Sequence, residues 1–194
     1  RAIPLLEELH RRDSTDAAIV FSLGTTHLQS GDSTKGIEFM RHANRMEPTQ
    51  PRYWIGLGVL ALDESKFDDA VAIMDSAIVR VGPQAGLYAI KGNALNRLGK
   101  TPEAVAALEQ AIQLDSTLFS AMGTLALIYD RLDNLSRVEE YYQRAIRLSD
   151  SAAVYLNNLA YAYAQRGVQL ERAKALVQQA LARDPRNASY LDTM

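Results

Sequence analysis

Residues 54–77 read WIGLGVLALDESKFDDAVAIMDSA, and the spacing of small and large side chains in this stretch decides the fold. Its last alanine belongs to an evenly spaced column made of Ala43, Ala77, Ala111 and Ala145, and Ala180 follows one residue late. Leu57-Gly58 has counterparts in the same register at 23–24, 91–92, 125–126 and 159–160. A fixed period of about 34 residues is typical of stacked helix pairs, in which no unit can bury its apolar face alone.

A third column of small residues keeps the same spacing. It runs through Gly36, Ala70, Ala104 and Val138, and Ala173 again comes one residue late. Both later columns slip together, so one residue has been inserted between Gly167 and Ala173. We expect the insertion in the turn between two helices, where added length costs least.

Turn residues support short antiparallel helices. Gly31, Gly99 and Gly167 fall between the predicted helices of their units, where a left-handed C-cap favours a residue without a side chain. Thr101-Pro102-Glu103 follows Gly99 and predicts an N-cap, a proline at the first helical position and an acid in the first turn.

The positions of Trp54, Leu57, Gly58, Ala70 and Ala77 resemble the tetratricopeptide repeat, whose signature runs W-x2-L-G-x2-Y, A-x3-F, P. The signature's Tyr column contains His27, Ala61, Leu95, Tyr129 and Tyr163. Its Phe column contains Met40, Met74, Leu108, Tyr142 and Val177. The resemblance implies an all-α fold, a right-handed superhelical solenoid of antiparallel helix pairs.

The columns divide the chain into repeats. Residues 1–16 are predicted to be the second helix of a preceding, truncated repeat, and residues 188–194 the start of a further, truncated one. Five repeats are predicted between them, at 17–50, 51–84, 85–118, 119–152 and, with the one-residue insertion, 153–187. We therefore expect the chain to be a piece of a longer protein whose exposed terminal repeats promote self-association.

Composition limits the partners. The formal charge is −2, from 21 basic and 23 acidic residues without a basic block, so we expect no nucleic-acid binding. No apolar run approaches the length of about 18 residues that a membrane-spanning helix needs, so we expect no membrane insertion of this segment. The chain has no cysteine, which excludes disulfides and thiolate metal sites.

A search for chemistry predicts no catalytic residue, no metal site and no cofactor. His10, His27 and His42 stand in different predicted helices without a second ligand at helical spacing, and His27 fills the Tyr column. Asp63, Glu64, Asp68 and Asp69 could be a cation site. Helix capping is the preferred interpretation, because acids favour the start of a helix and the EF-hand order is missing.

In proteins that this chain resembles, the first helices of successive repeats line a concave face that holds a peptide or a partner helix. Carried over by column, the resemblance predicts these groove residues: Asn93, Asn96, Arg97, Thr124, Leu127, Arg131, Asn157, Asn158, Tyr161 and Gln165. Asparagine amides can hold an extended backbone, and the two arginines could take a carboxylate. The alternative is a solvated polar face in which the arginines pair with Asp130 or Asp133.

The carboxylate clamp of chaperone-binding members is not predicted here. Lys91-Gly92-Asn93 matches part of that clamp, but Ala89 stands where a lysine is needed and Thr124 where a second asparagine is needed. We therefore do not expect this chain to bind a chaperone tail.

The predicted function is a non-enzymatic scaffold that binds a peptide or helix of another protein in its concave groove. Two alternatives stay open, a repeat arm of a larger enzyme whose catalytic domain lies elsewhere, and binding through the convex face. Asn157 to Tyr163, together with 180–187, resemble repeats common in bacterial members of the family. That resemblance favours a bacterial source and the periplasm or cell envelope over the cytoplasm.

Overall fold

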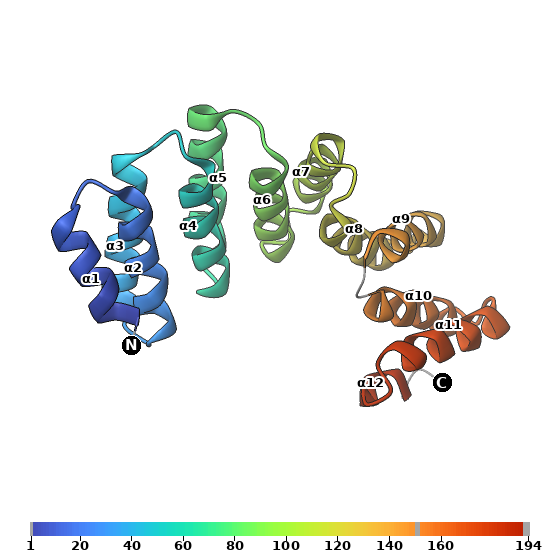
Figure 1. Cartoon of the computed structure of the whole chain (residues 1–194). Coiled ribbons are helices and arrows are strands. Elements are labelled where there is room, and N and C mark those ends of the chain that lie inside the picture. The colour runs from blue at the N-terminus through green and yellow to red at the C-terminus, as the bar shows by residue number, and fades with distance from the viewer. Residues whose placement is uncertain (1, 150–151, 192–194) are drawn as a thin grey trace. The chain divides into compact units, whose positions relative to one another are not determined.

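The computed structural model describes residues 2–149 and 152–191 (Figure 1). Within these residues every regular element is a helix, which confirms the predicted all-α class. The described helices are α1 (Ala2–Arg12), α2 (Ala17–Gln29), α3 (Ser33–Met46), α4 (Pro51–Asp63), α5 (Phe67–Val81), α6 (Ala85–Arg97), α7 (Thr101–Leu114), α8 (Phe119–Arg131), α9 (Leu135–Leu148), α10 (Ala153–Gln165), α11 (Leu170–Arg183) and α12 (Ala188–Leu191). None of these helices is long and apolar enough to cross a membrane.

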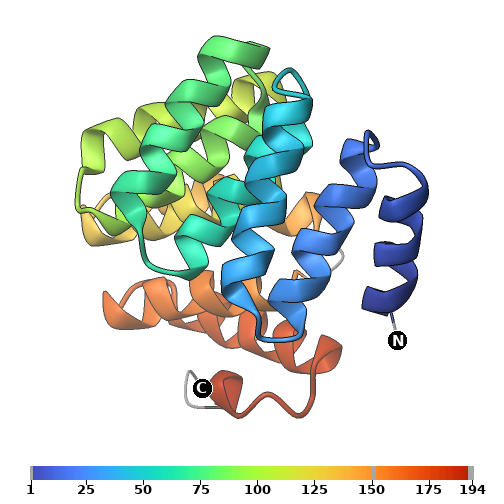
Figure 2. The same cartoon turned by 90° about the vertical axis from the view of Figure 1, so that its left-hand side faces the viewer.

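The chain forms two compact units, residues 1–100 with α1 to α6 and residues 101–194 with α7 to α12. In unit 1, α2 packs on α3, α4 on α5, and α6 on both α4 and α5. In unit 2, α8 packs on α9 and α10 on α11, while α9 also contacts α10. Figures 1 and 2 both show the blue helices α2 and α3 side by side. Each helix thus packs mainly on its neighbours in the chain, as in repeat proteins.

Four helix pairs fall within predicted repeats: α2/α3, α4/α5, α8/α9 and α10/α11. Helices α6 and α7 fall within the predicted repeat 85–118, but unit 1 ends between them. The repeat limits remain predictions. Three stretches lie outside the described residues: residue 1 in the truncated repeat at the start, residues 150–151, and residues 192–194 in the truncated repeat at the end.

The alanines of the second-helix column are fully buried in both units. Ala43, Ala77, Ala111, Ala145 and Ala180 are all 0% exposed. Gly24 shows why a small residue is needed in the first helix, because a Cβ there would lie 2.9 Å from the carbonyl oxygen of Gly36. The helix backbones can therefore approach closely only while these positions stay small.

The turn inside each helix pair has a left-handed residue at the same repeat position. Gly31, Gly99 and Gly167 have φ of 89°, 74° and 64°, which confirms the predicted left-handed conformation, one residue after the C-caps Ser30, Leu98 and Arg166. Ser65 and Asp133 occupy the same repeat position with φ of 58° and 53°, although neither is glycine. The next residue's N–H donates back to the end of the first helix, as Lys66 N does to Ala61 O at 2.8 Å. The hydrogen bond satisfies a terminal carbonyl, so the backbone imposes this conformation even without glycine.

Two turns differ from the simple pattern. The turn between α10 and α11 holds one residue more than the others, and Gln169 there is also left-handed, with φ of 49°. Helix α7 begins at Thr101, so the prediction of Thr101 as N-cap was wrong by one residue. Pro102 is tolerated at the second helical position because backbone N–H groups in the first turn have no partner within the helix.

Candidate functional site

The predicted groove residues are divided between the two units. Asn93, Asn96 and Arg97 lie on α6 in unit 1. The other seven lie in unit 2, with Thr124, Leu127 and Arg131 on α8 and Asn157, Asn158, Tyr161 and Gln165 on α10. Each unit therefore has its own part of the candidate site on first helices.

In unit 2, the side chain of Tyr155 on α10 reaches α8. A Cβ at Gly123 on α8 would lie 2.6 Å from Cε1 of Tyr155 on α10. The ring of Tyr155 thus occupies the space that a side chain at position 123 would take. This contact places the predicted residues of the two helices on neighbouring elements.

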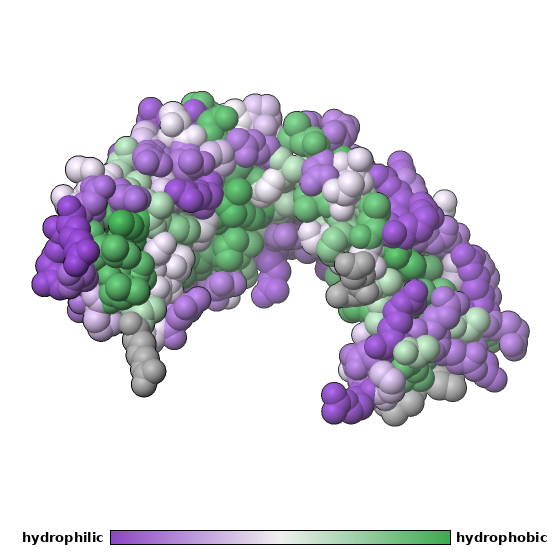
Figure 3. All heavy atoms as spheres, in the orientation of Figure 1, coloured by the Kyte–Doolittle hydropathy of each residue, from purple (hydrophilic) through white to green (hydrophobic). Residues whose placement is uncertain are grey.

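In three of the five predicted repeats, one position on the first helix presents an apolar side chain to solvent, whereas Thr25 and Asn93 occupy it in the other two. Val59 on α4, Leu127 on α8 and Tyr161 on α10 are 42%, 46% and 49% exposed, and they are separated by whole multiples of the repeat period. Tyr163, which fills the Tyr column, is fully buried, so packing does not explain Tyr161. Figure 3 shows apolar surface residues in green, bordered by polar residues in purple, on both units. Exposed apolar side chains that recur at one position favour a contact surface.

Polar side chains lie near Tyr161 on α10. The Tyr161 hydroxyl accepts a hydrogen bond of 2.8 Å from Gln165 Nε2. Asn158 forms a side-chain hydrogen bond with Tyr142, and burial raises the pKa of that tyrosine. Asn157 Oδ1 is buried and has no hydrogen-bond partner among the described residues. The Asn158 side chain is therefore hydrogen-bonded within the unit, while the buried amide oxygen of Asn157 has no partner among the described residues.

Arg97 on α6 is supported by a ring of its own unit. The Arg97 guanidinium carbon lies 5.1 Å from the centre of the Phe67 ring. Arg97 is exposed, whereas Asn93 and Asn96 are half-buried. A cation over a ring keeps its charge accessible while its planar group is supported.

Arg166 binds the carboxylates of both Asp130 and Asp133. The sequence had suggested these carboxylates as partners of Arg97 and Arg131. Its Nη1 lies 2.7 Å from Asp130 Oδ1, and its Nη2 lies 2.9 Å from Asp133 Oδ1. Nη2 also donates to the Asp130 carbonyl oxygen at 3.1 Å. Arg166 follows α10 and meets the end of α8. The repeat period brings equivalent helix ends together, but it does not say which long side chain spans them.

Unit 2 also contains a cluster of tyrosines that was not predicted. Tyr129 on α8 and Tyr141 on α9 stack with their ring centres 5.7 Å apart and 7° between the planes. Both hydroxyls donate to Glu109 Oε1 on α7, at 3.4 and 3.3 Å. Burial, followed by the charge of Glu109, raises the pKa of Tyr141 to about 12. The cluster is a closed, hydrogen-bonded contact among three helices.

Three of the residues that were candidates for metal binding pack in the core or lie in the first turn of a helix. His27 is buried, stacks on Phe39 with ring centres 5.5 Å apart, and its Nδ1 lies 3.6 Å from Asp32 Oδ2. Asp68 and Asp69 lie in the first turn of α5, where acids favour the positive end of the helix dipole. Within the described ranges no three His, Asp or Glu side chains gather in a way that could hold a metal ion.

Comparisons with known proteins agree with this architecture. Residues 60–191 match the family model of the Psidin N-terminal TPR repeats region. No curated protein matches the sequence. A crystal structure of MamA is similar, with 23% identity over 87% of this chain and 98% of MamA, and a TM-score of 0.73.

Two further solved structures share the fold. PilW, described as a widely conserved type IV pilus biogenesis factor, has a TM-score of 0.81 and 16% identity over 96% of this chain and 86% of its own. YrrB, described as a TPR protein with an unusual peptide-binding site, has a TM-score of 0.68 and 14% identity over 96% of both chains. At these identities the structures show the fold alone. With the family match over most of its length, the chain belongs to the tetratricopeptide repeat proteins, in the family of the Psidin N-terminal repeat region.

Proposed function

We propose that this chain is a non-enzymatic scaffold whose first-helix face in unit 2 binds a peptide or helix of a partner protein. The tetratricopeptide fold supports a role in protein interaction in general. One observation carries the finer proposal, the exposure of Leu127 and Tyr161 at the same repeat position on neighbouring helices. A partner that covers both side chains gains the free energy of removing their apolar surface from water.

The groups beside this pair suit a polypeptide ligand. Asn157 and Asn158 are half-buried on the same helix as Tyr161. Arg131 on α8 and Gln165 on α10 are exposed at one repeat position. Amides can hold the backbone of an extended segment, and a guanidinium can take a carboxylate. Similar chemistry on α6, with Arg97 and Asn93, extends the proposal to unit 1.

Site-specific photo-crosslinking tests the face that is used. A photoreactive amino acid replaces Leu127 in one variant and Leu170 in another. Leu170 is 56% exposed on the second helix α11, so it provides a matched apolar control. We expect a partner to crosslink through position 127 and not through position 170. Crosslinks through position 170 alone would contradict the proposal.

Affinity measurements on the captured partner give the second test. Leu127→Ser combined with Tyr161→Ser should weaken binding at least about tenfold, which corresponds to about 1.4 kcal/mol. Leu170→Ser removes a similar exposed apolar side chain and should leave affinity unchanged. Arg97→Ala with Arg131→Ala should weaken a partner that carries a carboxylate without lowering the melting temperature. Unchanged affinity in both double variants would reject the first-helix face.

A further inference from the structure

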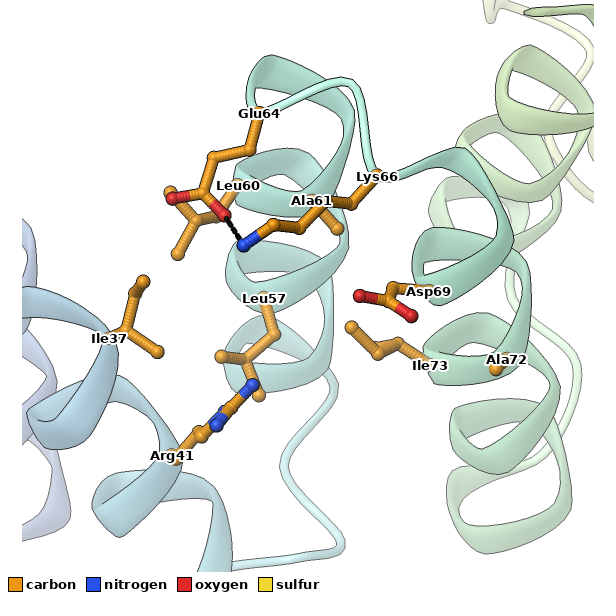
Figure 4. Close-up of a pocket in the computed structure, with 10 residues that line it drawn as sticks. All are labelled: Ile37, Arg41, Leu57, Leu60, Ala61, Glu64, Lys66, Asp69, Ala72 and Ile73. Carbon is orange, nitrogen blue, oxygen red and sulfur yellow. Dashed lines mark ion pairs between the residues drawn. The ribbon is translucent and has the colours of Figure 1, made fainter. Parts of the chain in front are cut away.

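A pocket lies among α3, α4 and α5 of unit 1, away from the exposed column on the first helices. Its volume is about 320 Å³, and Figure 4 shows its side chains converging from all three helices. The apolar residues that line it include Ile37, Leu57, Leu60, Ala61 and Ile73. An enclosed apolar cavity of about 150 Å³ can already hold benzene, so the volume of this open, partly charged pocket suffices for an aromatic side chain.

Comparison with the other helix pairs explains why the pocket exists. Positions 27 and 39, 61 and 73, and 129 and 141 are equivalent, because they differ by whole multiples of the repeat period. His27 stacks on Phe39 with ring centres 5.5 Å apart, and Tyr129 stacks on Tyr141 at 5.7 Å. Ala61 and Ile73 replace this ring pair, and both line the pocket. The pocket therefore lies where two other pairs place stacked rings.

The charge at the pocket is also reversed. Glu109 accepts hydrogen bonds from both tyrosine hydroxyls in unit 2. The equivalent residue two repeats earlier is Arg41, which lines the pocket. Its side chain is exposed and has no hydrogen-bond or ion-pair partner among the described residues. Arg41 thus offers hydrogen-bond donors at the repeat position where Glu109 offers an acceptor.

Opposite charges on the two walls of the pocket set the orientation of a ligand. Asp69 lies on the α5 side, across from Arg41 on the α3 side (Figure 4). Glu64 and Lys66 at the rim neutralise each other, with Lys66 Nζ 2.8 Å from Glu64 Oε2. A ligand carboxylate is attracted by Arg41 and repelled by Asp69, so it belongs on the α3 side.

We propose that this pocket binds a segment of a partner protein that inserts an aromatic side chain and places a neighbouring carboxylate on Arg41. The inserted ring replaces the missing ring pair and buries apolar surface against Leu60 and Ile73. The carboxylate forms a charge-assisted hydrogen bond with the guanidinium. This second surface is independent of the first-helix face, and either can bind without the other.

Short synthetic peptides on the whole chain test the ligand chemistry. The probe has a central Trp-Glu between Gly and Ser residues, and the controls replace that centre by Ala-Glu or Trp-Lys. Binding is followed by NMR through the methyl signals of Ile37, Leu60 and Ile73. We expect the Trp-Glu peptide to shift these signals and to bind at least about tenfold more tightly than either control. Equal affinity for the Ala-Glu peptide would overturn the proposal.

Variants test the pocket itself. Arg41→Glu should weaken the Trp-Glu peptide and strengthen the Trp-Lys peptide. Arg41→Glu with Ala61→Tyr and Ile73→Tyr rebuilds the cluster of unit 2, so it should fill the pocket and abolish binding while circular dichroism shows an intact helical fold. If this triple variant does not fold, the charge swap in Arg41→Glu decides alone.

Tyr161→Ala separates the two surfaces. It alters the first-helix face and should leave the affinity for the Trp-Glu peptide unchanged. The proposal fails if Tyr161→Ala abolishes peptide binding, if the peptide shifts signals only around Leu127, or if the folded triple variant binds as tightly as the native chain.

Discussion

At the scale of single residues, the turn inside a helix pair demands a conformation that most side chains resist. Ser65 and Asp133 adopt it with φ of 58° and 53°, at the repeat position where Gly31, Gly99 and Gly167 stand. A left-handed residue other than glycine costs roughly 1–2 kcal/mol. Asp133 has a compensating ion pair with Arg166, whereas the Ser65 side chain forms no bond within the described residues that would offset the cost.

Ser65→Gly should therefore stabilise unit 1. We expect the free energy of unfolding to rise by about 0.5–1 kcal/mol, because relief of strain exceeds the added flexibility of the unfolded chain. Chemical denaturation measures the change. Asp133→Gly provides the contrast, since it also removes the acceptor for Arg166 and should give a smaller gain or a loss. A destabilised Ser65→Gly variant would show that the left-handed conformation carries no strain.

A second prediction at this scale concerns alkaline pH. The pKa of Tyr141 is raised to about 12 from 10.0, so the folded state favours the protonated phenol. The stability from this group is complete below pH 10 and is lost as pH rises toward 12, because the unfolded chain ionises first. Tyr141→Phe should show a smaller fall in melting temperature between these pH values. Glu109→Gln removes the nearby charge and should lower the Tyr141 pKa, measured by phenolate absorbance.

At the scale of helices, the close approach within a pair depends on the buried alanine column. Ala180 on α11 is 0% exposed, whereas Ala175 on the same helix is exposed. Ala180→Leu should lower the free energy of unfolding by about 1–3 kcal/mol through overpacking. Ala175→Leu adds the same side chain at the surface and should change stability by no more than about 0.5 kcal/mol. Equal effects of the two substitutions would mean that the alanine column does not set the helix spacing.

The helices could be predicted because periodic columns report burial directly. Ala43, Gly24 and their counterparts are small for one reason, the contact inside each pair, so the regular recurrence of small residues reveals them. The Arg166 ion pairs could not be predicted with the same ease. They depend on which long side chain reaches Asp130, and a repeat period does not determine that reach.

The pocket in unit 1 was missed for a different reason. It results from side chains that are small, and Ala61 by itself looks like a normal variant of the Tyr column. Reading that column together with the one that contains Phe39, Ile73 and Tyr141 would have shown the stacked rings at 27/39 and 129/141 and their replacement at 61/73. The first-helix residues were chosen by resemblance, and their role in binding remains a prediction.

At the scale of the whole molecule, the contacts of each unit are mainly between neighbouring helices. Stability in such a chain is approximately a sum of local terms, so damage should stay local. Tyr142→Ala removes a fully buried ring in unit 2, and Tyr53→Ala does so in unit 1. We expect hydrogen exchange to lose protection mainly in the unit that carries the substitution. Equal loss in both units for both variants would show that the chain unfolds as one cooperative body.

The missing ring pair at Ala61 and Ile73 has a consequence for how such proteins acquire new ligands. The repeats share one structural frame, so one copy can lack the ring pair while the copies at 27/39 and 129/141 have it. The smaller side chains of Ala61 and Ile73 leave a pocket in place of the rings, and Arg41, where another repeat has Glu109, selects the charge of the ligand. The stacked rings in the neighbouring helix pair α2/α3 therefore indicate the shape of the ligand that this pocket can accept.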